Sequence, residues 1–260
     1  MIQDGAPPPL GAAPLTRDAF LGGRVLAWQP ARGCGYRAGT DAVLLAAAAP
    51  ARAGESVLDA GCGVGVAALC LLARVPGARV AGVEIQPQMA ALARRNGGAA
   101  LEVFEGDLLD PPPGLRARAF DHVITNPPFH DRARGVPAPE PARERAMGES
   151  VPLGDWLRAA LARLRSGGRL AAVLPAERLG DALVALGGRV GGPAILPVAP
   201  REGREASRAI LLARKGGRAP VRLLAPLVMH EGASHTGACD HGARALALLR
   251  DAAPLRLPEP

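Results

Sequence analysis

The sequence of 260 residues has few aromatic residues, few cysteines and almost no lysine. Phe, Trp and Tyr make up 3% of it, and Lys215 is the one lysine among 31 basic residues. The four cysteines, Cys34, Cys62, Cys70 and Cys239, have the spacing of neither a zinc site nor a dense disulfide framework. The histidines near the C-terminus match no common zinc motif. We therefore predict free thiols and no bound metal.

Long hydrophobic runs are also missing. The longest, "AVLLAAAAP" from Ala42, is too short to span a bilayer, and the first twenty residues lack the basic-led apolar core of a signal peptide. We therefore expect a soluble, cytoplasmic protein. We also expect a monomer, although no pattern in the sequence bears on the oligomeric state. With 48% hydrophobic residues the chain can bury a large core. Residues 1–16, rich in Pro, Gly and Ala, are expected to be a disordered tail, and 17–260 a single domain.

Positive charge is in excess. The net charge is +7, and between Arg201 and Arg222 seven basic residues stand against Glu202 and Glu205, a local charge of +5. Such a distribution indicates an acidic partner, nucleic acid or an anionic membrane. A GC-rich coding sequence would also produce an excess of arginine, so this alternative stays open.

Short strand-like runs alternate with Ala, Leu and Arg stretches from residue 56 onward. Strands are predicted at 56–61, 78–84, 101–107, 120–126, 168–175, 194–200 and 207–216. Helices are predicted at about 65–74, 87–96, 154–165 and 177–187. Continuous apolar strands alternating with helices favour an α/β fold, with a mostly parallel sheet covered by helices on both faces.

The segment "LDAGCGVGVAAL" (58–69) contains a strand, a glycine loop and the start of a helix. Gly61, Gly63 and Gly65 place bare backbone at the carboxyl edge of the sheet, where a cofactor binds against the main chain. Gly-x-Gly-x-Gly alone is equally compatible with a dinucleotide site or a tight turn. Asp59 favours a different ligand, because a carboxylate there repels a pyrophosphate and attracts a positively charged group.

Two later strands end in acids. Glu84 can accept hydrogen bonds from both hydroxyls of a ribose, and Asp107, followed by Leu108 in "EGDLLD", from an adenine amino group. Together with the glycine loop and Asp59, these residues resemble the S-adenosylmethionine site of Rossmann-like methyltransferases.

"NPPF", Asn126 to Phe129, ends the fourth strand. Pro127 and Pro128 fix an extended turn and remove two N–H donors, which leaves the Asn126 oxygen and the Pro127 carbonyl as acceptors for a planar amino group. Phe129 offers an apolar face for stacking a base. In the context of the glycine loop, this tetrad predicts methyl transfer to an amide or exocyclic amine.

Residues 20–65, with "QP", "GYR" and "TDAVLLA" before the glycine loop, resemble the bacterial tRNA adenine-N6 methyltransferases that act beside the anticodon of a valine tRNA. The resemblance covers roughly residues 20–232. It implies a Rossmann-like class I methyltransferase with a seven-stranded, mostly parallel sheet and an antiparallel strand near the C-terminus. It also implies a cofactor-capping segment at 17–55, a core at 56–232, an extension at 233–260, and cofactor contacts from Arg37 and Thr40.

Three other functions remain open. "NPPFH" also occurs in ribosomal RNA guanine-N2 methyltransferases, whose usual duplicated half has no room in 260 residues. Protein glutamine-N5 methyltransferases of release factors usually carry a long helical domain before the glycine loop, where only about 55 residues stand here. A non-catalytic RNA-binding relative is disfavoured by the intact acids and Asn126. The arginine-rich segment 131–150 is expected to be a mobile, substrate-facing loop.

Overall fold

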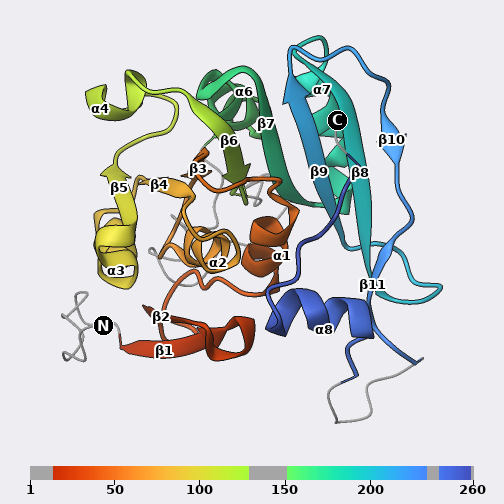
Figure 1. The fold of residues 1–260 in the computed structure, drawn as a ribbon, viewed down its shortest axis with the longest axis horizontal. Coiled ribbons are helices and arrows are strands. Elements are labelled where there is room, and N and C mark those ends of the chain that lie inside the picture. The colour runs from red at the N-terminus through yellow and green to blue at the C-terminus, as the bar shows by residue number, and fades with distance from the viewer. Residues whose placement is uncertain (1–13, 129–150, 233–239, 259–260) are drawn as a thin grey trace.

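The computed structural model of the chain describes residues 14–128, 151–232 and 240–258. A nine-stranded sheet forms its centre, in the order β10-β8-β9-β7-β6-β3-β4-β5, with β11 also paired to β8 (Figure 1). The core strands are β3 (Ser56–Ala60), β4 (Arg79–Glu84), β5 (Leu101–Glu105), β6 (Phe120–Thr125), β7 (Leu164–Pro175), β8 (Val190–Arg201) and β9 (Arg208–Lys215). Only β9 runs antiparallel to its neighbours, β7 and β8.

All seven predicted strands are therefore present, and the antiparallel strand is the last of them, as predicted. The sheet differs from the expected seven strands by two short additions, β10 (Arg222–Leu223) and β11 (Leu227–His230), both parallel to β8. Both are short, two and four residues, so neither gives a sequence pattern long enough to stand out. The strands β7 and β8 also begin before the predicted residues, at Leu164 and Val190.

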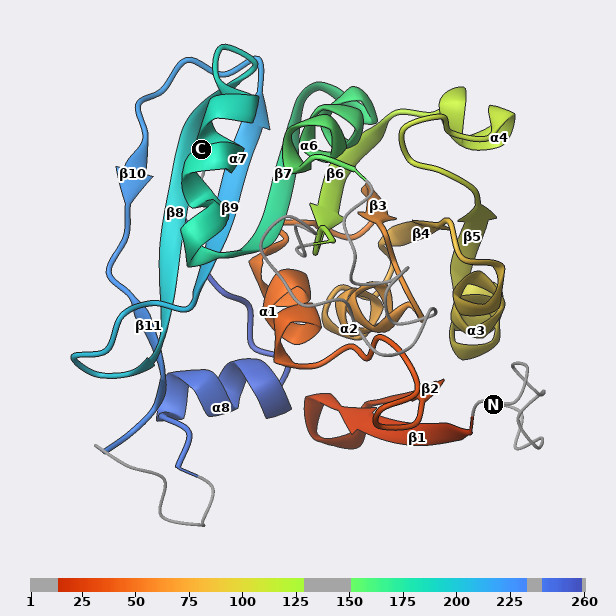
Figure 2. The same cartoon turned by 180° about the vertical axis from the view of Figure 1, so that it is seen from behind.

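Helices cover both faces of the sheet. The α-helices are α1 (Thr40–Ala48), α2 (Val66–Arg74), α3 (Pro87–Gly97), α4 (Pro113–Arg116), α6 (Leu153–Ala162), α7 (Leu179–Leu186) and α8 (Ala243–Arg250). Short 3-10 turns occupy Leu21–Gly23, Gly98–Ala100 and Ala176–Arg178. Figure 2 shows α7 in front of β8 and β9. Among the described residues, none of these helices has the length and apolar character needed to cross a bilayer.

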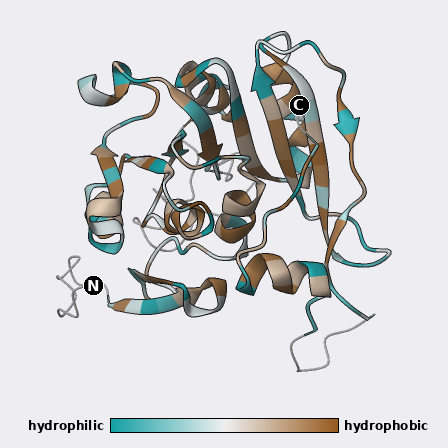
Figure 3. Cartoon of the chain, viewed as in Figure 1, coloured by the Kyte–Doolittle hydropathy of each residue, from teal (hydrophilic) through white to brown (hydrophobic). Residues whose placement is uncertain are grey.

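Strand alternation divides the core into two layers. On β6, Val123 packs in the layer of α6 and α7, whereas its neighbour Ile124 packs in the layer of α1 and α2. Successive side chains of a strand point to opposite faces, so each central strand contributes to both layers. Hydrophobic residues are accordingly concentrated in the central strands and in α1 and α2 (Figure 3). Because the central strands are buried on both faces, their sequences are continuous apolar runs.

The segment before the core contains more structure than the sequence indicated. β1 (Leu15–Phe20) and β2 (Val25–Pro30) form an antiparallel hairpin, so the last two residues of the predicted tail belong to a strand. Residues 1–13 lie outside the described part. Helix α1 was not predicted, because a run dominated by alanine and leucine has no polar face. It is buried against α2, α8 and β7, which leaves no side for polar residues.

Candidate active site

The glycine loop follows β3 and turns sharply into α2. Gly61, Gly63 and Gly65 have φ of +75°, +54° and +86°, a region that side chains rarely adopt. A Cβ atom at Gly61 would lie 2.9 Å from the Trp156 ring, which packs beneath the loop. The Trp156 indole donates to the Thr125 hydroxyl at 2.9 Å. The backbone conformation therefore requires all three glycines, and at Gly61 the Trp156 ring also leaves no room for a side chain.

Asp59 lies at the end of β3 and is 2% exposed. Its Oδ2 atom has no hydrogen-bond partner among the described residues. Burial, together with the nearby charge of Glu84, raises its pKa from 3.8 to about 7. Burying a carboxylate oxygen without a hydrogen-bond donor raises the free energy of the folded protein, and a cationic group bound beside it would offset that penalty.

Glu84 ends β4 and binds the glycine loop directly. Its Oε2 accepts a hydrogen bond from the Gly63 amide and its Oε1 from the Gln86 amide, each at 2.9 Å. The side chain is buried, and burial raises its pKa above the usual 4.5. Each carboxylate oxygen keeps a second lone pair, so Glu84 can hold the loop and still accept from a ligand hydroxyl.

Asp107 and Leu108 follow β5 at the same edge. The Asp107 Oδ1 accepts from the Leu109 amide at 2.9 Å, which fixes the turn, and Leu108 is buried. The backbone amide of Gly106 donates to the Glu84 carbonyl at 3.0 Å. The ends of β4 and β5 are thus joined, and the structure brings all three predicted acids to one edge of the sheet.

Asn126 follows β6 at this edge. Its Nδ2 donates to the Tyr36 hydroxyl at 3.1 Å, while its Oδ1 is buried and has no partner in the described part of the chain. Pro127 is buried and Pro128 partly exposed, and neither offers a backbone N–H. Phe129 and the segment 131–150 lie outside the described residues, so the predicted stacking and the mobile loop stay predictions.

Arg37 and Thr40 occupy different positions in the capping segment. Arg37 is bound to the β1–β2 hairpin, where it donates to Asp18, to the Thr16 hydroxyl and to the Pro30 carbonyl. Thr40 is the exposed first residue of α1. The arginine therefore fastens the segment to the hairpin, and the cofactor contacts of both residues stay predictions.

Sequence reasoning missed the polar side chains that attach the hairpin to the site. Asn96 at the end of α3 accepts from the Trp28 amide at 2.8 Å and donates to the carbonyls of Trp28 and Val64. Gln29 on β2 is 1% exposed and accepts from the Ala38 amide at 2.8 Å. The one available signal was an asparagine and a glutamine at positions that otherwise read as apolar.

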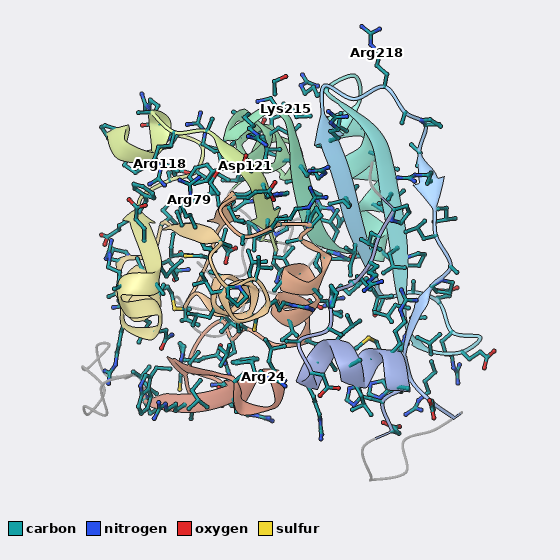
Figure 4. The ribbon with its side chains drawn as sticks, in the orientation of Figure 1. Arg24, Arg79, Arg118, Asp121, Lys215 and Arg218 are labelled. Carbon is teal, nitrogen blue, oxygen red and sulfur yellow. The ribbon has the colours of Figure 1, made fainter. Side chains whose placement is uncertain are left out.

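The basic stretch 201–222 is divided between opposite edges of the sheet. Its first part surrounds the turn between β8 and β9, where the parallel strands end. Its last part follows β9 at the other edge, and Figure 4 shows Lys215 and Arg218 on the side of Arg79 and Arg118. The charge of this stretch is therefore not gathered on one surface.

Several of these cations bind the protein itself. Arg201 pairs with the partly buried Asp240, and Arg208 with Asp41 at 3.0 Å. Lys215 Nζ donates to two backbone carbonyls near the end of α6 at 2.8 and 2.6 Å. Because these side chains already bind groups of the protein, fewer positive charges than the local value of +5 are available to bind an acidic ligand.

His122 is 1% exposed, and its Nε2 lies 2.8 Å from Glu55 at the far edge of the sheet. Within the described residues, no three His, Cys, Asp or Glu side chains are grouped so that they could hold a metal. Cys34, Cys62 and Cys70 are free thiols, as predicted. Cys239 lies outside the described part.

Comparison with known proteins gives consistent matches. Residues 37–180 match the family model described as methyltransferase small domain. The chain is 38% identical over 165 residues to a tRNA1(Val) (adenine(37)-N6)-methyltransferase of Porphyromonas gingivalis, covering 57% of this chain and 62% of that protein. It is 30% identical over 190 residues to the protein of that name in Aeromonas salmonicida, covering 70% and 78% of the two chains.

A solved structure is also similar. A predicted O-methyltransferase of Agrobacterium tumefaciens has a TM-score of 0.67 and 29% sequence identity to this chain. The alignment covers 83% of this chain and 98% of the other.

Proposed function

Because the chain belongs to the methyltransferase small domain family, we propose that it transfers a methyl group from S-adenosylmethionine to the exocyclic N6 amine of an adenine in tRNA, beside the anticodon. The observation that carries the proposal is a pair of buried oxygens, Asp59 Oδ2 and Asn126 Oδ1, that have no hydrogen-bond partner within the described ranges and lie at the edge that bears the glycine loop. The first fits a cationic amino group, and the second fits the hydrogen of a neutral amine.

The fold supports this chemistry. The predicted Rossmann-like α/β fold is confirmed by the similarity to the Agrobacterium structure. In such sheets, ligands bind beyond the carboxyl ends of the strands, where Asp59, Glu84, Asp107 and Asn126 lie. The residues proposed to hold the cofactor are the glycine loop, Asp59, Glu84, Asp107 and Leu108.

The protein residues orient the acceptor amine. When bound, S-adenosylmethionine supplies an electrophilic methyl group, and its transfer leaves S-adenosylhomocysteine while the amine nitrogen gains a C–N bond and loses one proton. Asn126 Oδ1 accepts a hydrogen from the amine, and the Pro127 carbonyl is available to accept the other. Both acceptors favour a nitrogen whose lone pair points away from them. A strong base is not required, because a methylated amine cation is acidic and loses its proton to water.

The tRNA substrate is proposed on the names of the aligned relatives. The alignment spans 62% of the length of the Porphyromonas protein. The match to the family model covers residues 37–180, which include the glycine loop and "NPP". Guanine N2 of ribosomal RNA presents the same planar amine and is the second candidate. Action as a monomer in the cytoplasm is part of the proposal and stays a prediction from the sequence.

The proposal is tested by incubating the protein with labelled S-adenosylmethionine and two anticodon stem-loops, one with adenine next to the anticodon and one with guanine there. We expect methyl transfer to adenine, with N6-methyladenine identified by mass analysis. Preferential transfer to guanine would assign the chain to the second candidate. Transfer to neither RNA, with transfer to a protein fraction, would move the substrate to a glutamine side chain.

Cofactor binding is expected to weaken as the pH falls below about 7. The cofactor ammonium pairs with ionised Asp59, whose pKa burial raises to about 7, so below that pH a proton must leave before the pair forms. The affinity should fall roughly tenfold per pH unit until the pKa of the complex is reached. Calorimetry at pH 8 and pH 5.5 measures the change, and Asp59→Asn should flatten it. An affinity that is constant over this range in the unmodified protein would contradict the ammonium–Asp59 pairing.

A further inference from the structure

Tyr36 is located between the cofactor loop and the proposed acceptor of the target amine. Its hydroxyl accepts from Asn126 Nδ2 at 3.1 Å, although the two residues are 90 positions apart in the sequence. A Cβ at Gly63 would lie 3.8 Å from the tyrosine ring, so the same side chain also flanks the glycine loop. The chemistry of methyl transfer described above makes no use of Tyr36.

The backbone beside Tyr36 is fixed by partly buried polar contacts. Gln29 accepts from the Ala38 amide and donates to Asp18 Oδ2, both at 2.8 Å. Arg37, the residue after Tyr36, pairs with the same Asp18 carboxylate. The hairpin therefore determines where the tyrosine hydroxyl stands, since a short segment held at both following residues has little freedom to shift.

The hydroxyl is also held in its neutral form. Burial raises the pKa of Tyr36 from 10 to about 12, and the charges of Asp41, Asp59 and Glu84 act in the same direction. A neutral hydroxyl accepts one hydrogen from the Asn126 amide and keeps its own proton. Because an amide has its acceptor and its donors on opposite sides, attaching Nδ2 to Tyr36 directs Oδ1 the other way.

We infer that Tyr36 is a positioning residue, which holds the Asn126 side chain so that Oδ1, and not the amide nitrogen, faces the incoming amine. The inference rests on the proposed function. Without the tyrosine hydroxyl, the Asn126 amide loses the hydrogen bond that anchors it, becomes free to rotate by half a turn and can present its NH₂ group to another NH₂ group. Two donors then face each other, and that rotamer is unproductive.

The test is Tyr36→Phe, which removes the hydroxyl and keeps the ring. We expect the kcat for methyl transfer to an adenine stem-loop to fall by about tenfold, with the RNA KM and the cofactor affinity by calorimetry unchanged. Trp28→Phe is a matched control, because Trp28 is an aromatic residue of the same hairpin whose ring packs against Arg17 and Arg95. Its kcat should match that of the unmodified protein.

A double-mutant cycle separates positioning from general structural damage. In an Asn126→Ala background, Tyr36→Phe should not lower kcat any further, since no amide remains to be oriented. In the cofactor-free protein, the Asn126 side-chain amide protons should exchange faster with solvent in Tyr36→Phe, a readout by NMR that requires no methyl transfer. The inference would be overturned if Tyr36→Phe changed neither kcat nor the amide exchange. It would also be overturned if the kcat losses of the two substitutions were additive, or if cofactor affinity fell by the same factor as kcat. Failure of the unmodified protein to methylate RNA would overturn the proposed function and leave the exchange result standing.

Discussion

Asn126→Ala is expected to reduce the turnover of methyl transfer by roughly 10²-fold or more while S-adenosylmethionine affinity stays nearly intact. The substitution removes the one described side-chain oxygen that is buried, unpaired and placed after β6. The residues proposed to hold the cofactor lie at the carboxyl ends of β3, β4 and β5, and the substitution changes none of them. Single-turnover methylation of the adenine stem-loop measures the first quantity, and calorimetry measures the second.

The control for this prediction is a substitution beside Asn126 that preserves the hydrogen bonds of the site. Thr125→Ser alters the preceding residue but retains the hydroxyl that accepts from Trp156 and donates to the Ala60 carbonyl. Its turnover should stay within about threefold of the unmodified protein, since both hydrogen bonds survive. Near-normal turnover in Asn126→Ala would remove this side chain from the mechanism.

Glu84→Ala is expected to weaken S-adenosylmethionine binding by about 1–3 kcal/mol and also to lower the free energy of unfolding by about 1–3 kcal/mol. The first effect is the loss of a charge-assisted contact to the ligand. The second arises because the buried amide of Gly63 and the amide of Gln86 lose their acceptors. Calorimetry and urea denaturation at neutral pH measure the two quantities.

Glu105→Ala provides the comparison. Glu105 is the register partner of Glu84 on β5, but its side chain is exposed and pairs with Arg94. Removing an exposed ion pair changes stability by at most about 1 kcal/mol. It should leave cofactor affinity unchanged. If Glu84→Ala binds the cofactor as tightly as Glu105→Ala does, Glu84 is no part of the cofactor site.

The sequence by itself determined the seven core strands, four of the helices and the edge of the sheet that carries the site. These features depend on local patterns: apolar runs of strand length, and glycine or an acid directly after them. Parallel strands that alternate with helices place all their carboxyl ends together. Asp59, Glu84, Asp107 and Asn126 could therefore be assigned to one place without any knowledge of their contacts.

Only the tertiary structure decided how the capping segment meets that edge. The Tyr36–Asn126 bond, the Asn96 contacts with β2 and the attachment of Arg37 to Asp18 each join positions far apart in the chain. No periodicity encodes such pairs, because a side-chain hydrogen bond depends on where two elements pack and not on the spacing within either one. For the same reason, the sequence alone suggests that the positive stretch 201–222 forms one surface. A strand reversal at residues 202–207 sends its two parts to opposite edges, and groups of the protein itself pair with several of its charges.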